Sequence, residues 1–184
     1  MRILAIEDGG FKLDALKKKG RALLVGVFTC DFYIEKLIIS HVQIDGLDAT
    51  SKLIKIAKNQ KLHLDLIILG AISFAGFNLI DIMKVYSTLK VPIIVVNSKK
   101  PKEGAIERAI WRHFFDWQER LLIIEKTKKP MKLILRKTEN IYLQIAGISF
   151  IRAAKIIKKL TIFGKQPEPI RIARILAYEI SKQK

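Results

Sequence analysis

Three apolar stretches at the start of the chain have the length and residue types of β-strands. Residues 2–7 form a short apolar run, residues 22–29 are rich in β-branched and aromatic types, and residues 34–44 alternate imperfectly between apolar and polar positions. No helical pattern separates these stretches. Consecutive strands without a helix between them favour antiparallel pairing, so the sequence predicts a meander of three strands.

From residue 48 onward the pattern predicts alternating helices and strands. Helices are expected at 48–58, 79–89, 103–117, 149–160 and about 169–180, with helical pieces in the basic segment 119–138. Strands are expected at 64–69, 92–96 and 141–146, and a loop with two prolines at 164–170. This order predicts an α/β fold of the ribonuclease H type. Its mixed sheet has three antiparallel strands, then alternating helices and parallel strands, with helices on both faces.

Length and composition predict one domain over residues 1–184. Half of the 184 residues are hydrophobic, and no Pro/Gly/Ser-rich linker divides them. No apolar run approaches the roughly 18 residues of a membrane span, and the chain begins with a strand pattern instead of a signal peptide. The single cysteine, Cys30, cannot form an internal disulfide and is interpreted as structural. We expect a cytoplasmic protein.

The charge balance makes nucleic acid the first expected partner. The chain has 34 Lys and Arg against 17 Asp and Glu, a formal net charge of +17. An excess of this size favours polyanions, and an anionic membrane is a weaker second choice because no strongly amphipathic terminal helix stands out. The alternative is that the charge reflects a basic, Lys- and Ile-rich proteome.

Four carboxylates are candidates for a metal site. Glu7 and Asp8 end the first predicted strand, and Asp45 and Asp48 stand between the third strand and the first helix. Carboxylates gathered at strand ends are hard oxygen ligands for Mg²⁺ or Mn²⁺. The alternatives are a turn at Asp8 and a turn with a helix N-cap at Asp45 and Asp48.

Aromatic and basic residues after two of the strands are candidates for nucleic-acid contacts. Phe74 and Phe77 could stack on a base, or could belong to the core. Lys99 and Lys100 follow a predicted parallel strand and could contact phosphate, or could form a solvated loop. The three histidines show no spacing typical of zinc ligands, and neither histidine nor cysteine forms a nucleophile pattern.

Four segments of the chain resemble the endonuclease V superfamily. Residues 147–154 (GISFIRAA) and 164–173 (GKQPEPIRIA) are similar to its closing segment. Residues 45–50 (DGLDAT) and 74–81 (FAGFNLID) resemble an archaeal branch that is also called endonuclease dU. The resemblance covers nearly the whole chain, and the FAGFN and PEPIR stretches are its most specific parts.

The resemblance implies a ribonuclease H-like hydrolase that uses Mg or Mn to cut nucleic acid near deaminated bases, as in DNA repair. Glu7 and Asp8 match the acidic end of the first strand, and Asp48 matches a second catalytic acid. Two expected ligand positions are instead occupied by Gly70 and Arg174. These departures lower the expectation of catalysis, because a two-metal centre needs several oxygen ligands and a cationic side chain repels metal.

Three hypotheses follow for the function. The first is a metal-dependent endonuclease on DNA or RNA containing hypoxanthine or uracil, in which Asp45 or Asp81 could replace the missing ligands. The second is a nucleic-acid-binding protein of the same fold without catalysis. Arg171 and Arg174 are further candidates for its nucleic-acid contacts. The third is a structural or interaction protein.

Overall fold

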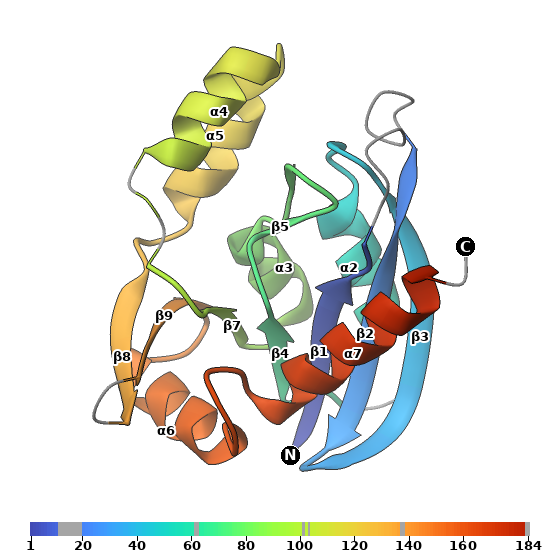
Figure 1. Cartoon of the computed structure of the whole chain (residues 1–184), viewed down its shortest axis with the longest axis vertical. Helices are drawn as coiled ribbons and strands as arrows, with labels where there is room; N and C mark the ends of the chain where they lie inside the picture. Colours follow the sequence, from blue (N-terminus) through green and yellow to red (C-terminus); the bar gives the residue numbers. More distant parts are fainter. Residues whose placement is uncertain (11–19, 61–62, 101, 103, 137–138, 183–184) are drawn as a thin grey trace.

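The predicted antiparallel meander forms one half of a seven-stranded sheet. The computed structural model describes residues 1–10, 20–60, 63–100, 102, 104–136 and 139–182. The strand order is β3-β2-β1-β4-β7-β9-β8 (Figure 1). The antiparallel strands of the meander are β1 (Arg2–Asp8), β2 (Arg21–Cys30) and β3 (Tyr33–Gln43).

Parallel strands extend the sheet on the other side of β1, as the helix–strand alternation predicted. β4 (Leu66–Leu69) pairs with β1 and β7 (Ile93–Asn97) pairs with β4, both in parallel. Because parallel strands end at the same edge of a sheet, the carboxyl ends of β1, β4 and β7 lie together. In α/β sheets this edge is where ligands bind.

The last part of the sheet differs from the prediction. Residues 131–136 form a strand, β8 (Met131–Arg136), where helical pieces were expected. The reason is a period of two: Leu133 is buried and Leu135 packs against the same core, while Ile134 between them is exposed. The next strand, β9 (Glu139–Ala146), runs antiparallel to β7, so the alternation of parallel strands ends there.

Two of the predicted helices have different bounds. The expected helix 103–117 is α4 (Ala105–His113), which is followed by a turn and α5 (Trp117–Lys126); Glu103 lies outside the described residues. The expected helix 79–89 begins later, as α3 (Ile82–Leu89). The residues before it form a small hairpin of β5 (Ser73–Phe74) and β6 (Asn78–Leu79), which the sequence did not predict.

Helices cover both faces of the sheet, which explains the apolar run in β1. Leu4 and Ile6 point into the core beneath α2 (Ala49–Lys58) and α3, and Ile3 and Ala5 point into the core beneath α6 (Phe150–Leu160) and α7 (Glu168–Lys182). Figure 1 shows α7 lying across β1 and β2. No helix among the described residues is long and apolar enough to cross a membrane.

Candidate functional site

The carboxyl ends of β1 and β4 bring Glu7 and Gly70 together. Ile6 pairs with Leu69, so the next residues along the two parallel strands, Glu7 and Gly70, are neighbours. A Cβ built on Gly70 would overlap Oε1 of Glu7 and would lie 2.6 Å from its Cδ. The Glu7 carboxyl therefore fills the space that a side chain at position 70 would need.

Glu7 forms an ion pair with Arg174 of α7. Alternate residues of a strand face the same side, so Glu7 points toward α7 as Ile3 and Ala5 do. Small side chains such as Ala173 let α7 approach the sheet closely. Nη2 of Arg174 donates to Oε1 of Glu7 at 2.7 Å, and Glu7 is only 5% exposed. The guanidinium is half-exposed and reaches the carboxylate from the solvent side.

Burial changes the ionisation of Glu7. It raises the pKa of the Glu7 carboxyl from 4.5 to about 7, and the charge and hydrogen bond of Arg174 oppose this rise. The cause is the loss of the water that would solvate a charged carboxylate. Near neutral pH, Glu7 is therefore divided between its protonated and its ionised form.

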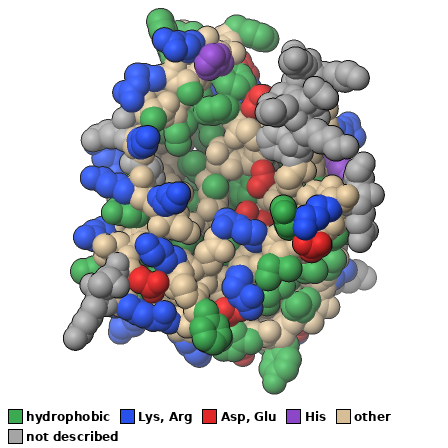
Figure 2. All heavy atoms as spheres, in the orientation of Figure 1, with side chains coloured by type: hydrophobic (Ala, Val, Ile, Leu, Met, Phe, Trp, Pro, Cys, Tyr) green, Lys and Arg blue, Asp and Glu red, His purple; other side chains and the backbone are tan. Residues whose placement is uncertain are grey.

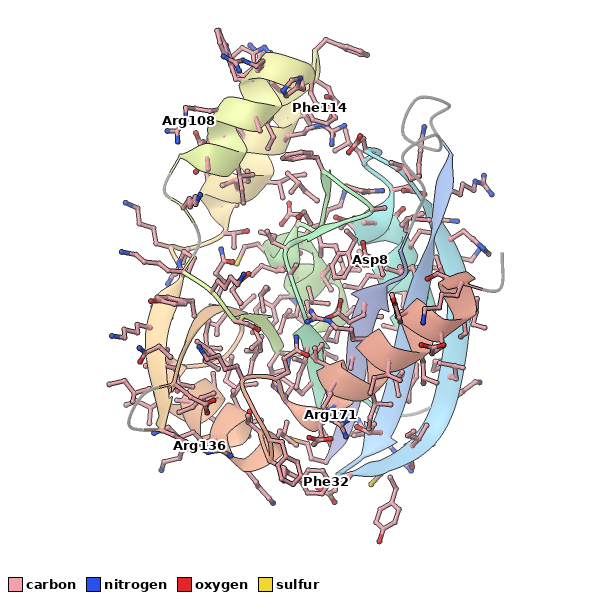
Figure 3. All side chains as sticks on the ribbon, in the orientation of Figure 1. Asp8, Phe32, Arg108, Phe114, Arg136 and Arg171 are labelled. Atoms are coloured by element: carbon pink, nitrogen blue, oxygen red, sulfur yellow. The ribbon has the colours of Figure 1, made fainter. Side chains whose placement is uncertain are left out.

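Asp8 points to the opposite face of the sheet and binds the β5–β6 hairpin. The backbone N–H of Ala75 donates to Oδ2 of Asp8 at 2.6 Å. Ala75 has a φ of 44°, which is unusual for a residue with a side chain, and the bond from Asp8 helps to hold it there. Burial raises the pKa of Asp8, and the Ala75 N–H opposes this rise. Figure 3 shows Asp8 at the end of β1, beside this hairpin.

Asp45 and Asp48 hold the same hairpin. Oδ1 of Asp45 accepts from the backbone N–H of Phe77 at 2.8 Å, and Oδ1 of Asp48 accepts from Nδ2 of Asn78 at 2.7 Å. The expected capping of α2 by Asp48 is wrong, because its side chain makes no capping bond. Oδ1 of Asn78 accepts from the backbone N–H of Ala49 at 2.9 Å instead.

These carboxylates do not form the ligand set of a Mg or Mn site. Within the described part of the chain, no group of three or more His, Cys, Asp or Glu could hold a metal ion. Glu7 is paired with Arg174. Asp8, Asp45 and Asp48 accept hydrogen bonds from the hairpin. Asp81 accepts from the N–H of Lys84 at the start of α3. Since Mg²⁺ and Mn²⁺ require several oxygen ligands, the residues as arranged do not fit either ion.

The basic candidates divide into exposed and paired side chains. Lys99 and Lys100 are exposed just after β7, at the same edge of the sheet as Glu7. Arg171 forms a 2.6 Å ion pair with Glu168 of its own helix. Arg174 is engaged by Glu7. The two lysines are thus better placed than the two arginines to meet a phosphate.

The two phenylalanine candidates have different environments. Phe74 is 1% exposed and belongs to the core beneath α2 and α3, so the expectation that it stacks on a base is wrong. Phe77 is partly buried, and its ring lies 5.3 Å from that of Phe114, tilted by 57°. Phe77 therefore joins the hairpin to the turn between α4 and α5.

Arg120 of α5 organises this edge of the sheet, and the sequence reasoning missed it. The side chain is only 3% exposed and donates to the backbone oxygens of Asp45, Gly46 and Phe77 at 2.7–3.1 Å. It also pairs with Asp116 at 2.8 Å. The spacing of four between Asp116 and Arg120 was a readable helix pair, but nothing in the sequence indicated the long-range bonds.

Comparison with known proteins relates the whole chain to one family. A family model described as endonuclease dU matches residues 1–181. A UPF0215 protein of Methanosarcina mazei is 37% identical over 185 residues, which cover 98% of this chain and 91% of the relative. A UPF0215 protein of Thermococcus gammatolerans is 35% identical over 179 residues, which cover 96% and 90%.

Solved structures confirm the fold. A protein of unknown function from Archaeoglobus fulgidus superimposes with a TM-score of 0.84 at 34% identity and 97% coverage of both chains. Human endonuclease V gives 0.64 at 15% identity, with coverage of 99% and 84%. Ciona intestinalis endonuclease V, in complex with DNA that contains an inosine, gives 0.64 at 14% identity, with coverage of 99% and 86%. The predicted ribonuclease H-like fold is therefore correct.

Proposed function

The chain belongs to the endonuclease dU family, and from this premise we propose that it binds nucleic acid without cutting it. In this proposal the fold is retained and the metal centre is replaced by the Glu7–Arg174 ion pair. The strands bound are DNA or RNA, and deaminated bases such as hypoxanthine and uracil are the first to test.

The ion pair is the observation that carries this proposal. A guanidinium 2.7 Å from the Glu7 carboxylate supplies the positive charge that a divalent cation would otherwise supply. A second cation at the same carboxylate would be repelled by Arg174. Gly70 offers no side-chain ligand, and a larger residue there would displace Glu7. Catalysis by two metals needs carboxylates that bridge the ions, and Glu7 in its present contacts cannot do so.

The charge of the molecule supports the binding part of the proposal. The formal net charge is +17, and Lys99 and Lys100 stand exposed beside the site. In Figure 2 the Lys and Arg side chains gather on the side of this face formed by α4, α5, β8 and α6. Contacts between such groups and phosphates supply most of non-specific affinity for nucleic acid.

A metal-dependent endonuclease remains the second candidate, and the position of Asp8 favours it. Asp8 stands beside Glu7 at the end of β1 and is partly exposed. For this activity Glu7 would have to leave Arg174, and Asp48 would have to leave Asn78, before either could hold Mg or Mn. The substrate would be nucleic acid with deaminated bases.

Fluorescence anisotropy with labelled single strands tests the proposal. Unmodified, inosine-containing and uracil-containing strands are titrated in EDTA at low and at high salt. We expect binding without metal and an affinity at least tenfold lower at high salt, since counterion release makes phosphate contacts salt-dependent. Absence of binding, or an affinity independent of salt, would contradict the proposal.

A pair of lysine variants locates the contact. Lys99→Ala/Lys100→Ala should reduce the slope of log K against log salt by about 2, because each lost phosphate contact lowers it by about 1. Lys55→Ala/Lys58→Ala on α2 is the matched control, since these exposed lysines belong to the helix that covers the sheet face opposite α7. Equal effects of the two pairs would mean that binding is spread over the whole surface.

A further inference from the structure

The outward face of α4 presents an aromatic ring between two arginines. Arg108, Trp111 and Arg112 are spaced by three and four residues, so they share one helix face, while Ile110 is buried on another. Trp111 is 67% exposed, and Phe115 in the following turn is 94% exposed. Two large rings exposed at one end of a helix are typical of a contact surface, because covering them with a partner is favourable.

The segment that carries these rings is fixed to the sheet edge. We name residues 105–126, which comprise α4, its turn and α5, the aromatic arm. The guanidinium of Arg120 lies 4.1 Å from the centre of the Phe114 ring, and Phe114 packs against Phe77 of the hairpin. Arg120 also bonds the backbone of the site loops. Trp111 and Phe115 are thus held in place before a partner binds, which lowers the entropy cost of binding.

Positive charge leads along the chain from the sheet edge to the arm. The acidic residues Glu119 and Glu125 are exposed on α5, and Glu107 of α4 is partly buried. Figure 3 shows Arg108 pointing away from the body of the protein. The α4 side of the arm therefore complements the charge of a phosphate backbone. Five exposed basic side chains lie between the end of β7 and the end of α4: Lys99, Lys100, Lys102, Arg108 and Arg112.

We propose that the aromatic arm is a stacking platform for single-stranded nucleic acid. Bases stack on Trp111 and Phe115, and Arg108 and Arg112 contact the flanking phosphates. The inference rests on the proposed nucleic-acid binding and adds the strandedness of the partner and the site that selects it. Every base has a π-face, but in a duplex these faces are covered by neighbouring bases, so exposed rings favour single strands.

The alternation of charge and rings decides between nucleic acid and a protein partner. Rings flanked by arginines satisfy a base and its phosphates together. A protein interface would place such rings at its centre and would be depleted of lysine there. Here three lysines lead directly into the helix that carries Trp111.

Trp111 reports on its own contact. The chain has two tryptophans, Trp111 and the partly buried Trp117, so Trp117→Phe leaves Trp111 as the single indole. This variant is titrated with oligo(dT) in EDTA while anisotropy of the labelled strand follows binding. We expect quenching of Trp111 emission in step with binding. Unchanged emission when anisotropy has reached its plateau would overturn the stacking role.

Affinity measurements separate this inference from the proposed function. Trp111→Ala/Phe115→Ala should bind oligo(dT) at least tenfold more weakly, because stacking contributes about 1–3 kcal/mol per base and 1.4 kcal/mol is tenfold. The salt slope should stay unchanged, since no phosphate contact is removed. Phe163→Ala, which removes a ring that is 72% exposed in the loop after α6, is the control and should bind as the parent does. Thermal melts check that each variant is folded.

The outcomes are distinguishable. If the parent protein binds no strand, both the proposed function and this inference fail. If the parent binds and the double variant binds equally well, the arm is not the platform while the proposed function stands. If the double variant keeps its affinity but loses a self-association seen by sedimentation, the rings serve a second copy of the chain, and the inference is overturned.

Discussion

Replacing Glu7 with glutamine should remove a large part of the pH dependence of folding stability. Burial raises the pKa of Glu7 from 4.5 to about 7, so the folded protein retains a proton that the unfolded chain has already lost. The stability that comes from this proton is fully present below pH 4.5. It is lost as the pH rises through about 7. Glutamine has the same shape as protonated Glu7 and no proton to release.

The size of the effect follows from the two pKa values. The interval from 4.5 to about 7, at 1.36 kcal/mol for each pH unit, corresponds to roughly 3 kcal/mol. The stability of Glu7→Gln minus that of the parent should therefore increase by roughly 3 kcal/mol between pH 4.5 and pH 8. Burial also raises the pKa of Asp8, but this acts equally in both proteins and cancels in the difference.

Urea denaturation at a series of pH values measures this difference. Glu179→Gln is the control, because Glu179 is an exposed glutamate whose partner, Lys182, lies on the same helix. It should leave the pH dependence as it is in the parent. A difference between Glu7→Gln and the parent that stays constant with pH would refute the reasoning. So would a difference that falls as the pH rises, since Arg174 would then lower the pKa of Glu7 more than burial raises it.

Three further predictions concern the packing and chemistry of the site. Gly70→Ala should lower the free energy of unfolding by about 1–3 kcal/mol, because its Cβ overlaps the Glu7 carboxyl; unchanged urea stability would contradict this packing. Arg120→Ala should cost about 3 kcal/mol or more and speed hydrogen exchange of the Phe77 amide, since the backbone oxygens of the site loops lose their donor; normal protection of that amide would count against it. Addition of Mn²⁺ should leave the Tm of the parent unchanged, because Glu7 is already paired with Arg174, and a rise that depends on metal concentration would show a site that these contacts do not reveal.

Much of the fold could be predicted because its signals are local. The runs that became β1, β2, β4 and β7 are buried strands, and their order along the chain implied the mixed sheet. β8 was missed because a basic, mixed composition concealed an alternation that becomes clear only once Leu133 is known to be buried. The β5–β6 hairpin was missed because each strand has two residues and its turn is held by distant groups such as Asp8 and Asp45.

The candidate site shows the same division between local and distant information. The parallel pairing of two predicted strands was enough to place Glu7 beside Gly70. The bond from Arg174 to Glu7 joins residues 167 positions apart, and no pattern along the chain encodes it. Asp48 was correctly placed before a helix, but its partner Asn78 comes from a hairpin that the sequence did not predict. Side-chain partners at this edge depend on tertiary contacts.

The most direct test of the central claim is a cleavage measurement on the intact protein. Inosine- and uracil-containing single and double strands are incubated with the parent protein and Mg²⁺ or Mn²⁺, with Glu7→Ala/Asp48→Ala in parallel. We predict that the strands stay intact under conditions in which anisotropy shows them bound. Metal-dependent cleavage by the parent that is lost in the double variant would contradict the account. It would mean that Glu7 leaves Arg174 to take up metal.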